Sequence, residues 1–145
     1  MYHMERDEWL AFVMHGTRTG KLATVRKDGA PHVAPIWFLV DATADGDHLV
    51  FNTGADTVKG KAIRRDPRIA LVVDTEEPPY SYVQFQAEAE ISEDMDDMLT
   101  WATRLGARYM GAERAADFGK RNAVPGELLI RARITKVLAH AEIAD

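Results

Sequence analysis

Tyr82-Val83-Gln84-Phe85-Gln86-Ala87-Glu88-Ala89-Glu90-Ile91 is the segment with the clearest periodicity in this sequence. Its apolar residues, from Val83 to Ile91, occupy every second position, and Gln and Glu occupy the positions between them. Successive side chains of a strand point to opposite faces of a sheet. The segment is therefore predicted to be a β-strand with one buried face and one face in water.

Five further segments are predicted to be strands, because they are apolar or alternating and are bounded by turn residues. They are Lys21–Arg26, Pro31–Val40, Leu49–Thr53, Arg68–Asp74 and Leu128–His140. The run from Ile69 to Val73 has no polar interruption and is expected to be a fully buried strand.

Three segments have helical spacing of their apolar residues and are predicted to be helices: Glu5–Met14, Met95–Met110 and Glu113–Arg121. A short helix is also expected to begin at Asp56 or Thr57, since either residue is a good N-cap. Six strands joined mainly by hairpins predict a mainly β fold, a small antiparallel barrel with helices covering its ends. A length of 145 residues without a linker favours a single domain spanning residues 1–145.

Composition excludes several classes of function. The chain has 18 Lys and Arg against 23 Asp and Glu, and a net charge of -5 argues against a general affinity for nucleic acid. The absence of cysteine excludes disulfides, iron–sulfur clusters and a thiol nucleophile, and it fits a reducing cytoplasm. The segment Met1–Trp9 is too charged for a signal peptide, and no apolar run reaches membrane length, so a cytoplasmic protein is expected.

Motifs for common chemistries are absent as well. The five histidines show no metal-ligand spacing, so no metal site is predicted. There is no nucleophile elbow, no phosphate-binding P-loop and no dinucleotide fingerprint. No residue is assigned as a catalytic acid or base.

The stretch Thr57–Arg68 concentrates positive charge in an acidic protein, with five cations and one anion. Lys59 and Lys61 fall in the first turns of the expected helix, where the helix dipole disfavours a cation. A lysine in this place indicates a bound anion beside the free backbone N–H groups. Arg64 and Arg65 fall near the helix end, where they either complete the helix or reach an anionic tail.

The predicted second strand contains a proline, Pro35, in the middle of His32–Phe38. Proline removes a hydrogen-bond donor from the ladder, which allows two interpretations. Either the strand lies at an edge of the sheet, or a flat apolar ligand lies against the backbone that the proline leaves unpaired. Ala34 and Pro35 are small and flat, and Trp37 is near them in sequence. Another wall of such a site is expected from Pro79, Tyr80 and Tyr82, although aromatic residues in strands more often belong to the core.

The order of these elements resembles the split β-barrel flavin and deazaflavin oxidoreductases, the superfamily of pyridoxamine 5′-phosphate oxidase. The residues that carry the resemblance are Gly20–Val25, Gly29–Phe38, Leu49–Thr53, Thr57–Lys59 and Arg65–Leu71. The resemblance covers nearly the whole chain. It implies a six-stranded antiparallel split β-barrel with peripheral helices.

The resemblance also implies roles for individual residues. Lys59 matches the lysine that grips the cofactor phosphate, Thr57 matches the neighbouring hydroxyl, and Val58-Lys59 matches the backbone cradle. The cofactor-binding residues expected on this basis are Val33, Ala34, Pro35, Ile36, Trp37, Asn52, Thr53, Thr57, Val58, Lys59, Lys61, Pro79 and Tyr80. The implied assembly is a homodimer with the cofactor cleft between subunits, closed by partner residues around Pro79–Tyr82 and Arg131 or Arg133.

The identity of the cofactor follows from a departure from the pattern. Members that use FMN in pyridoxamine phosphate oxidation carry an Arg-x-Val-Leu-Leu-Lys stretch on the second strand, whereas this chain has Val33-Ala34-Pro35-Ile36-Trp37-Phe38 without a cation. The strand resembles the actinobacterial branch that uses coenzyme F-420, an 8-hydroxy-5-deazaflavin. The expected function is hydride transfer from the reduced deazaflavin to a small organic acceptor. The alternatives are an FMN-dependent oxidase or reductase of the pyridoxamine 5′-phosphate oxidase type and a non-catalytic cofactor-binding protein.

Overall fold

Eight strands form one antiparallel sheet in the computed structural model, which describes residues 1–145. The strands are β1 (Tyr2–His3), β2 (Gly20–Val25), β3 (Pro31–Ile36), β4 (Leu39–Thr43), β5 (Gly46–Gly54), β6 (Arg68–Asp74), β7 (Tyr82–Ser92) and β8 (Glu127–Ala141). The helices are α1 (Arg6–Met14), α2 (Val58–Arg65), α3 (Met95–Met110) and α4 (Ala115–Asn122), with a 3-10 turn at Ala112–Arg114. None of these helices has the length and apolar character needed to cross a membrane.

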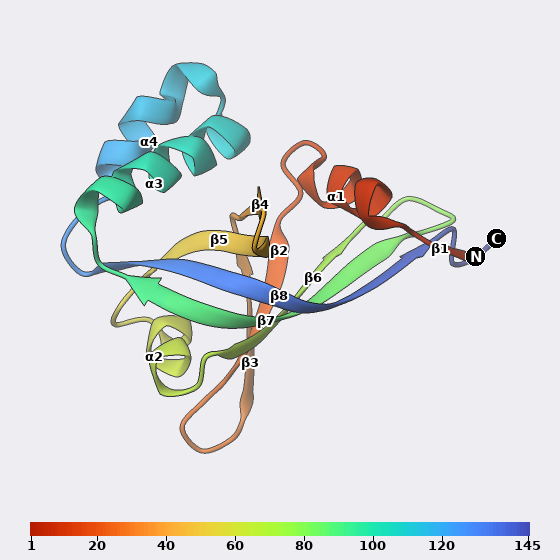
Figure 1. Cartoon of the computed structure of the whole chain (residues 1–145), viewed down its shortest axis with the longest axis horizontal. Coiled ribbons are helices and arrows are strands. Elements are labelled where there is room, and N and C mark those ends of the chain that lie inside the picture. Colours follow the sequence, from red (N-terminus) through yellow and green to blue (C-terminus); the bar gives the residue numbers. More distant parts are fainter.

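The order of strands in the sheet is β3-β2-β6-β7-β8-β5-β4, and β1 pairs with β8 (Figure 1). The two strands at the ends of this path, β3 and β4, are consecutive in the chain and are joined only by Trp37 and Phe38. The path therefore returns on itself through a two-residue connection, while no ladder of hydrogen bonds pairs β3 with β4. The predicted mainly β, antiparallel split-barrel fold is confirmed.

The number of strands differs from the expected six in two places. Pro31–Val40 was predicted as one strand but forms two, because the chain turns at Trp37–Phe38 and the Phe38 side chain enters the core with no exposed surface. The two-residue strand β1, which pairs with the end of β8, was not predicted, since two residues carry no periodicity.

Strand β6 is not buried on both faces, contrary to its uninterrupted apolar sequence. Ile69, Leu71 and Val73 point into the core, whereas Ala70 and Val72 are partly exposed on the outer face of the sheet. The alternation of β7 beside it is as predicted, since Val83, Phe85 and Ala87 are buried and the Gln and Glu residues between them are exposed.

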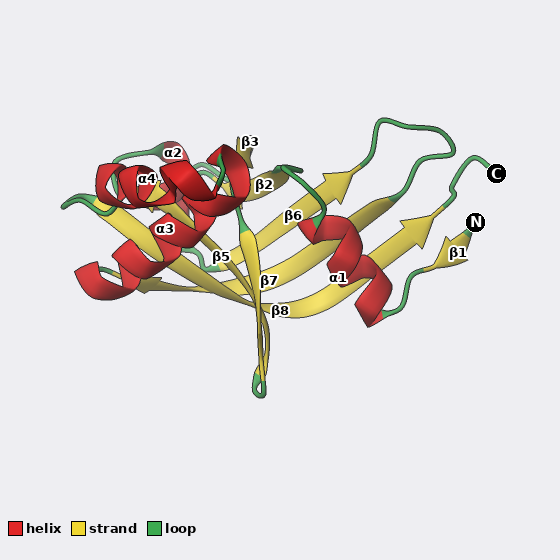
Figure 2. Ribbon diagram, turned by 90° about the horizontal axis from the view of Figure 1, so that it is seen from above, coloured by secondary structure: helices red, strands yellow, loops and turns green.

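The helices divide between the two halves of the sheet (Figure 2). Helix α1 covers the half that contains the termini, where Trp9 meets Phe85 edge to face at a ring separation of 5.3 Å. Helices α3 and α4 lie together over the other half. They are closely packed because Gly106 and Gly119 leave no room for a side chain against Phe118 and Thr103 respectively. The predicted boundaries of α3, Met95 and Met110, are confirmed.

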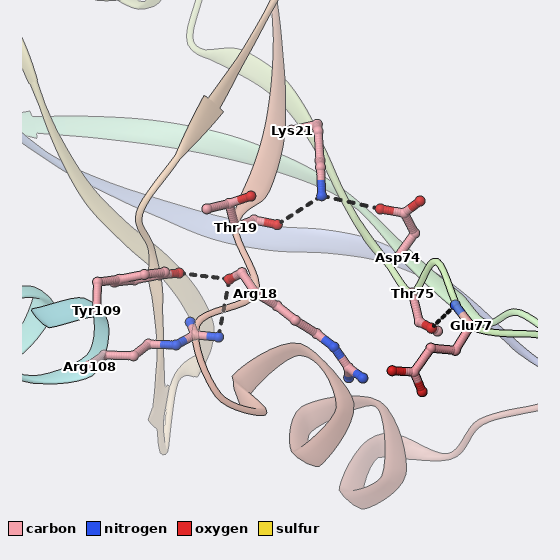
Figure 3. Close-up of polar contacts among 8 residues, drawn as sticks. All are labelled: Arg18, Thr19, Lys21, Asp74, Thr75, Glu77, Arg108 and Tyr109. Carbon is pink, nitrogen blue, oxygen red and sulfur yellow. Dashed lines mark hydrogen bonds and ion pairs between the residues drawn. The ribbon is translucent and has the colours of Figure 1, made fainter. Parts of the chain in front are cut away.

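The last turn of α3 ties three parts of the chain together. Figure 3 shows one of these contacts, in which Arg108 and Tyr109 both bond to the Arg18 carbonyl. The Arg108 guanidinium donates hydrogen bonds to four backbone carbonyl oxygens, among them those of Val13 at 2.7 Å and Phe38 at 2.6 Å. The Tyr109 hydroxyl donates to the carbonyl of Arg18 at 2.8 Å and accepts from the N–H of Phe38 at 3.1 Å. The end of α1, the entry to β2 and the turn between β3 and β4 are therefore held by two adjacent side chains.

Replacing Arg108 by methionine tests this arrangement. We expect R108M to lower the free energy of unfolding by roughly 2–3 kcal/mol, because several part-buried carbonyls lose their donor. Urea unfolding measures the change. The matched control is R104M, on an exposed position of the same helix. An R108M variant as stable as R104M would show that these hydrogen bonds do not hold the fold.

Candidate functional site

Helix α2 begins against the end of β5, and the contact leaves no space between them. Thr57, one of the two residues predicted as the cap, is the N-cap, and its hydroxyl accepts from the N–H of Gly60 at 3.0 Å. The same hydroxyl donates to the carbonyl of Gly54 at 2.7 Å. A Cβ atom on Gly60 would collide with the carbonyl oxygen of Gly54, so only glycine permits this approach.

This packing places Lys59 in the first turn of α2 at the end of β5. The first N–H groups of the helix, those of Val58 and Lys59, have no acceptor within the helix. The side-chain cap takes only the N–H of Gly60. The Lys59 ammonium forms no ion pair. A cation and unpaired backbone donors therefore gather at one point, which is the arrangement that binds an anion.

Lys59 opens onto a cavity of about 450 Å³, a size typical of cofactor and small-molecule sites. Part of its lining comes from the end of β3 and the following turn, and another part comes from β5, α2 and the start of β8. The residues that line the cavity are Thr19, Pro35, Ile36, Trp37, Asn52, Thr53, Gly54, Lys59, Asn122 and Glu127. The cavity thus joins an apolar wall to a cationic end.

The apolar wall is supported by the helices behind it. The Trp37 ring stacks on Tyr109 with a centroid separation of 5.1 Å and an interplanar angle of 5°. Phe118 of α4 meets the same indole at 5.7 Å. Pro35 lies in β3, which pairs only with β2, so the proline occupies an edge strand, where its missing N–H is tolerated.

The entry to β2 forms another part of the wall through Thr19. The Lys21 ammonium donates to the Thr19 carbonyl at 3.4 Å and pairs with Asp74 of β6 at 3.2 Å (Figure 3). Because Tyr109 holds the preceding carbonyl, of Arg18, this segment is fixed from both sides.

Six of the predicted cofactor-binding residues line the cavity: Pro35, Ile36, Trp37, Asn52, Thr53 and Lys59. The remaining ones do not: Val33, Ala34, Thr57, Val58, Lys61, Pro79 and Tyr80. Thr57 serves as the helix cap instead, and Val33 is exposed on the outer face of β3. Tyr80 borders a separate hollow beside Lys21 and Tyr82, so a single chain does not bring it to Lys59.

Sequence reasoning missed Glu127, the one carboxyl of the cavity. It is the first residue of β8 and pairs with Gly54 of β5, and its Oε2 accepts a hydrogen bond from the Asn52 amide at 3.3 Å. Burial raises the pKa of the Glu127 carboxyl above its ordinary value, while the hydrogen bond from Asn52 and the charge of Lys59 lower it. No local pattern marks this glutamate, because its place depends on the register between β8 and β5.

Nearly the whole chain matches one protein family. The profile described as pyridoxamine 5′-phosphate oxidase matches residues 6–141. The chain belongs to this family. No curated protein matches the sequence significantly.

Solved structures of similar shape agree with the family assignment. A conserved hypothetical protein of Mycobacterium tuberculosis is 26% identical with a TM-score of 0.79, covering 96% of this chain and 86% of its own. A protein described as an F420 reductase is 26% identical with a TM-score of 0.66, covering 88% of this chain and 94% of its own. A FAD-binding protein of Mesorhizobium loti, 20% identical with a TM-score of 0.65, covers 95% of this chain and 93% of its own and shares the fold.

The pyridoxamine 5′-phosphate oxidase family binds flavin-type cofactors. Not every positive charge of α2 is available to bind such a cofactor, because two of them already have partners. Arg64 pairs with Glu93 at 2.8 Å, and Arg65 donates to the Val25 carbonyl at 3.1 Å. Both arginines hold α2 against neighbouring segments. Lys59 and the exposed Lys61 are the α2 cations without such a partner.

A second hollow of this protein, of about 550 Å³, lies on the outer face of β2, β6 and β7. Its cation, Arg68, donates two hydrogen bonds to Asp66, at 3.0 and 2.7 Å. These bonds hold the pKa of Asp66 at about 2. Arg68 is therefore already paired, and the Lys59 cavity is the better candidate for an anionic cofactor.

The contact between Gly60 and Gly54 gives a direct test of how Lys59 is positioned. Alanine normally stabilises a helix relative to glycine by about 1 kcal/mol. We nevertheless expect G60A to lower the free energy of unfolding by roughly 1–3 kcal/mol, since the added methyl group forces α2 away from β5. Thermal unfolding measures the change, with K61A on the exposed neighbouring position as control. Stabilisation by G60A would contradict the close packing.

Proposed function

We propose that this protein is a cytoplasmic, homodimeric oxidoreductase that binds coenzyme F-420 and reduces a small organic acceptor. The observation that carries the proposal is the unpaired Lys59 at one end of a cavity whose other wall, Pro35 to Trp37, is uncharged. Membership of a flavin-binding family and the likeness to an F420 reductase at 26% identity support it.

The residues of the cavity fit the parts of this coenzyme. Lys59 and the first N–H groups of α2 suit its phosphate. The flat surface made by Pro35 and Trp37 suits the tricyclic ring. Lys61 is exposed and lies outside the cavity, so it is left for the glutamate tail rather than for the phosphate. Each exposed ion pair contributes only ~0.2–1 kcal/mol, so ring burial supplies more of the affinity than the tail.

The chain's own part in the reaction is binding and exclusion of water. The bound reduced coenzyme supplies the hydride, as cofactors do in enzymes that lack an evident acid or base. Trp37 is held rigidly by Tyr109 and Phe118, so the wall against which the ring lies does not need to be ordered on binding. The acceptor then approaches the face of the ring that the wall leaves open.

FMN is less well matched than the deazaflavin. Its terminal phosphate carries up to two negative charges at neutral pH. The cavity offers one cation for it, because β3 has no Lys or Arg and the two arginines of α2 are engaged elsewhere. The same family does include FMN enzymes, so FMN is the competing cofactor to test.

Titration of the purified protein with coenzyme F-420 and with FMN tests the cofactor. Trp37 lines the cavity, so tryptophan fluorescence reports the binding. We expect tighter binding of coenzyme F-420, and we expect K59A to weaken it on the order of ten-fold or more, because a charge-assisted contact is lost. The control is K27A, in the turn after β2. Tighter FMN binding, or equal affinities of K59A and K27A, would remove the assignment.

The outer face of the sheet supports a second copy of the chain as partner. The register aligns Val33, Ala23 and Ala70 in one row across β3, β2 and β6, and Val33 is 68% exposed. A row of small apolar side chains facing water is a surface that association would bury. Tyr80, which does not reach the cavity of its own chain, is then available to the cavity of the partner.

Mixing two variants tests a shared cavity. K59A and Y80A homodimers should each bind the coenzyme weakly if one site uses Lys59 from one subunit and Tyr80 from the other. After unfolding and refolding together, random pairing should restore about a quarter of the sites, because each mixed twofold dimer contains one intact site. Equilibrium titration counts these sites. Recovery of no sites from the mixture, with both variants folded and dimeric, would contradict a shared cavity.

A further inference from the structure

The cavity contains two ionisable side chains of opposite charge, Lys59 and Glu127. Its other lining residues carry no titratable group: α4 contributes Asn122, β5 contributes Asn52, Thr53 and Gly54, and the segments around β2 and β3 contribute Thr19, Pro35, Ile36 and Trp37. A carboxylate in a site for a phosphate works against binding, so its presence needs a reason.

Glu127 is held in place by its neighbours. Its backbone is paired with Gly54, and Asn52 donates to Oε2 at 3.3 Å. The other oxygen, Oε1, lies 3.9 Å from the point where a Cβ atom on Gly54 would stand. The carboxyl is therefore fixed at the end of β5, beside the start of α2. It makes no ion pair with Lys59, which leaves the lysine available to a ligand.

We propose that Glu127 determines cofactor specificity by disfavouring a phosphate monoester relative to a phosphate diester. This inference rests on the proposed function, since it places the cofactor phosphate at Lys59. The monoester of FMN carries ~1.5–2 negative charges at pH 7. The phosphate of coenzyme F-420 is linked onward to its tail, so it is a diester with a single charge. Lys59 balances one charge, and the second charge of a monoester is left facing the Glu127 carboxylate.

The Glu127 carboxyl is ionised less readily than an exposed one, because burial raises its pKa. Its discrimination should therefore weaken as the pH falls and the carboxyl takes up a proton. Lys59 on α2 is the charged group that faces it in the cavity; the polar side chains of β5 and α4 around it, Asn52 and Asn122, do not titrate. FMN itself loses negative charge as its phosphate takes up a proton at about pH 6. The informative quantity is therefore the difference between wild type and E127Q, which a purely structural role for Glu127 leaves independent of pH.

The experiment compares wild type with E127Q, which keeps the acceptor for Asn52 but removes the charge. Three ligands separate the contributions: riboflavin has no phosphate, FMN has a monoester and coenzyme F-420 has a diester. At about pH 7.5, we expect E127Q to bind FMN on the order of five- to ten-fold more tightly than wild type does. The gain for coenzyme F-420 should be only about two- to three-fold. Riboflavin affinity should be unchanged. The gain for FMN should become smaller as the pH is lowered from about 7.5 to about 5, because the Glu127 carboxyl, whose pKa is raised by burial, and the FMN phosphate both take up protons.

Controls keep the outcome decisive. E90Q, on the exposed face of β7, should change none of the affinities. E127A also removes the charge but introduces no amide in its place. If E127Q does not fold, E127A takes its place in the same titrations. Equal gains for FMN and riboflavin, or no greater gain for FMN than for coenzyme F-420, would overturn the inference while leaving the proposed function intact. If the wild-type protein binds none of the three ligands, both the inference and the proposed function are overturned.

Discussion

The backbone of Phe38 is the point on which both the fold and the cavity depend. Its N–H and carbonyl are held by Tyr109 and Arg108 of α3, at 3.1 and 2.6 Å. This clamp sets the turn at which the chain leaves one end of the strand path and joins the other. It also fixes the neighbouring Trp37, whose ring stacks on Tyr109. The end of the sheet and one wall of the Lys59 cavity are thus a single structural feature.

The opposite wall depends on close backbone approach rather than on side-chain packing. Gly60 brings α2 against Gly54, and the Thr57 cap fixes the first turn, so Lys59 stands over the cavity without an ion-pair partner. The helix dipole opposes a cation at this end. A bound phosphate would offset this unfavourable interaction. The position of Lys59, which the helix alone does not favour, is therefore explained by the proposed function.

Local signals predicted much of this arrangement, and tertiary contacts decided the rest. The alternation of β7, the cap of α2 and the place of Lys59 are properties of short segments, so they were readable in the sequence. The break after Ile36 depends on Arg108, which is some seventy residues away in the chain. The place of Glu127 depends on strand register, and the exposure of Ala70 and Val72 depends on what covers the outer face. None of these leaves a local signal.

A structure of the protein with coenzyme F-420 bound tests the central claim most directly. The account predicts the phosphate within hydrogen-bonding distance of the Lys59 ammonium and the first N–H groups of α2, with the ring against Pro35 and Trp37. Tyr80 of the second copy should close the same cavity. A coenzyme bound instead in the hollow beside Arg68, or with its phosphate away from Lys59, would contradict the account.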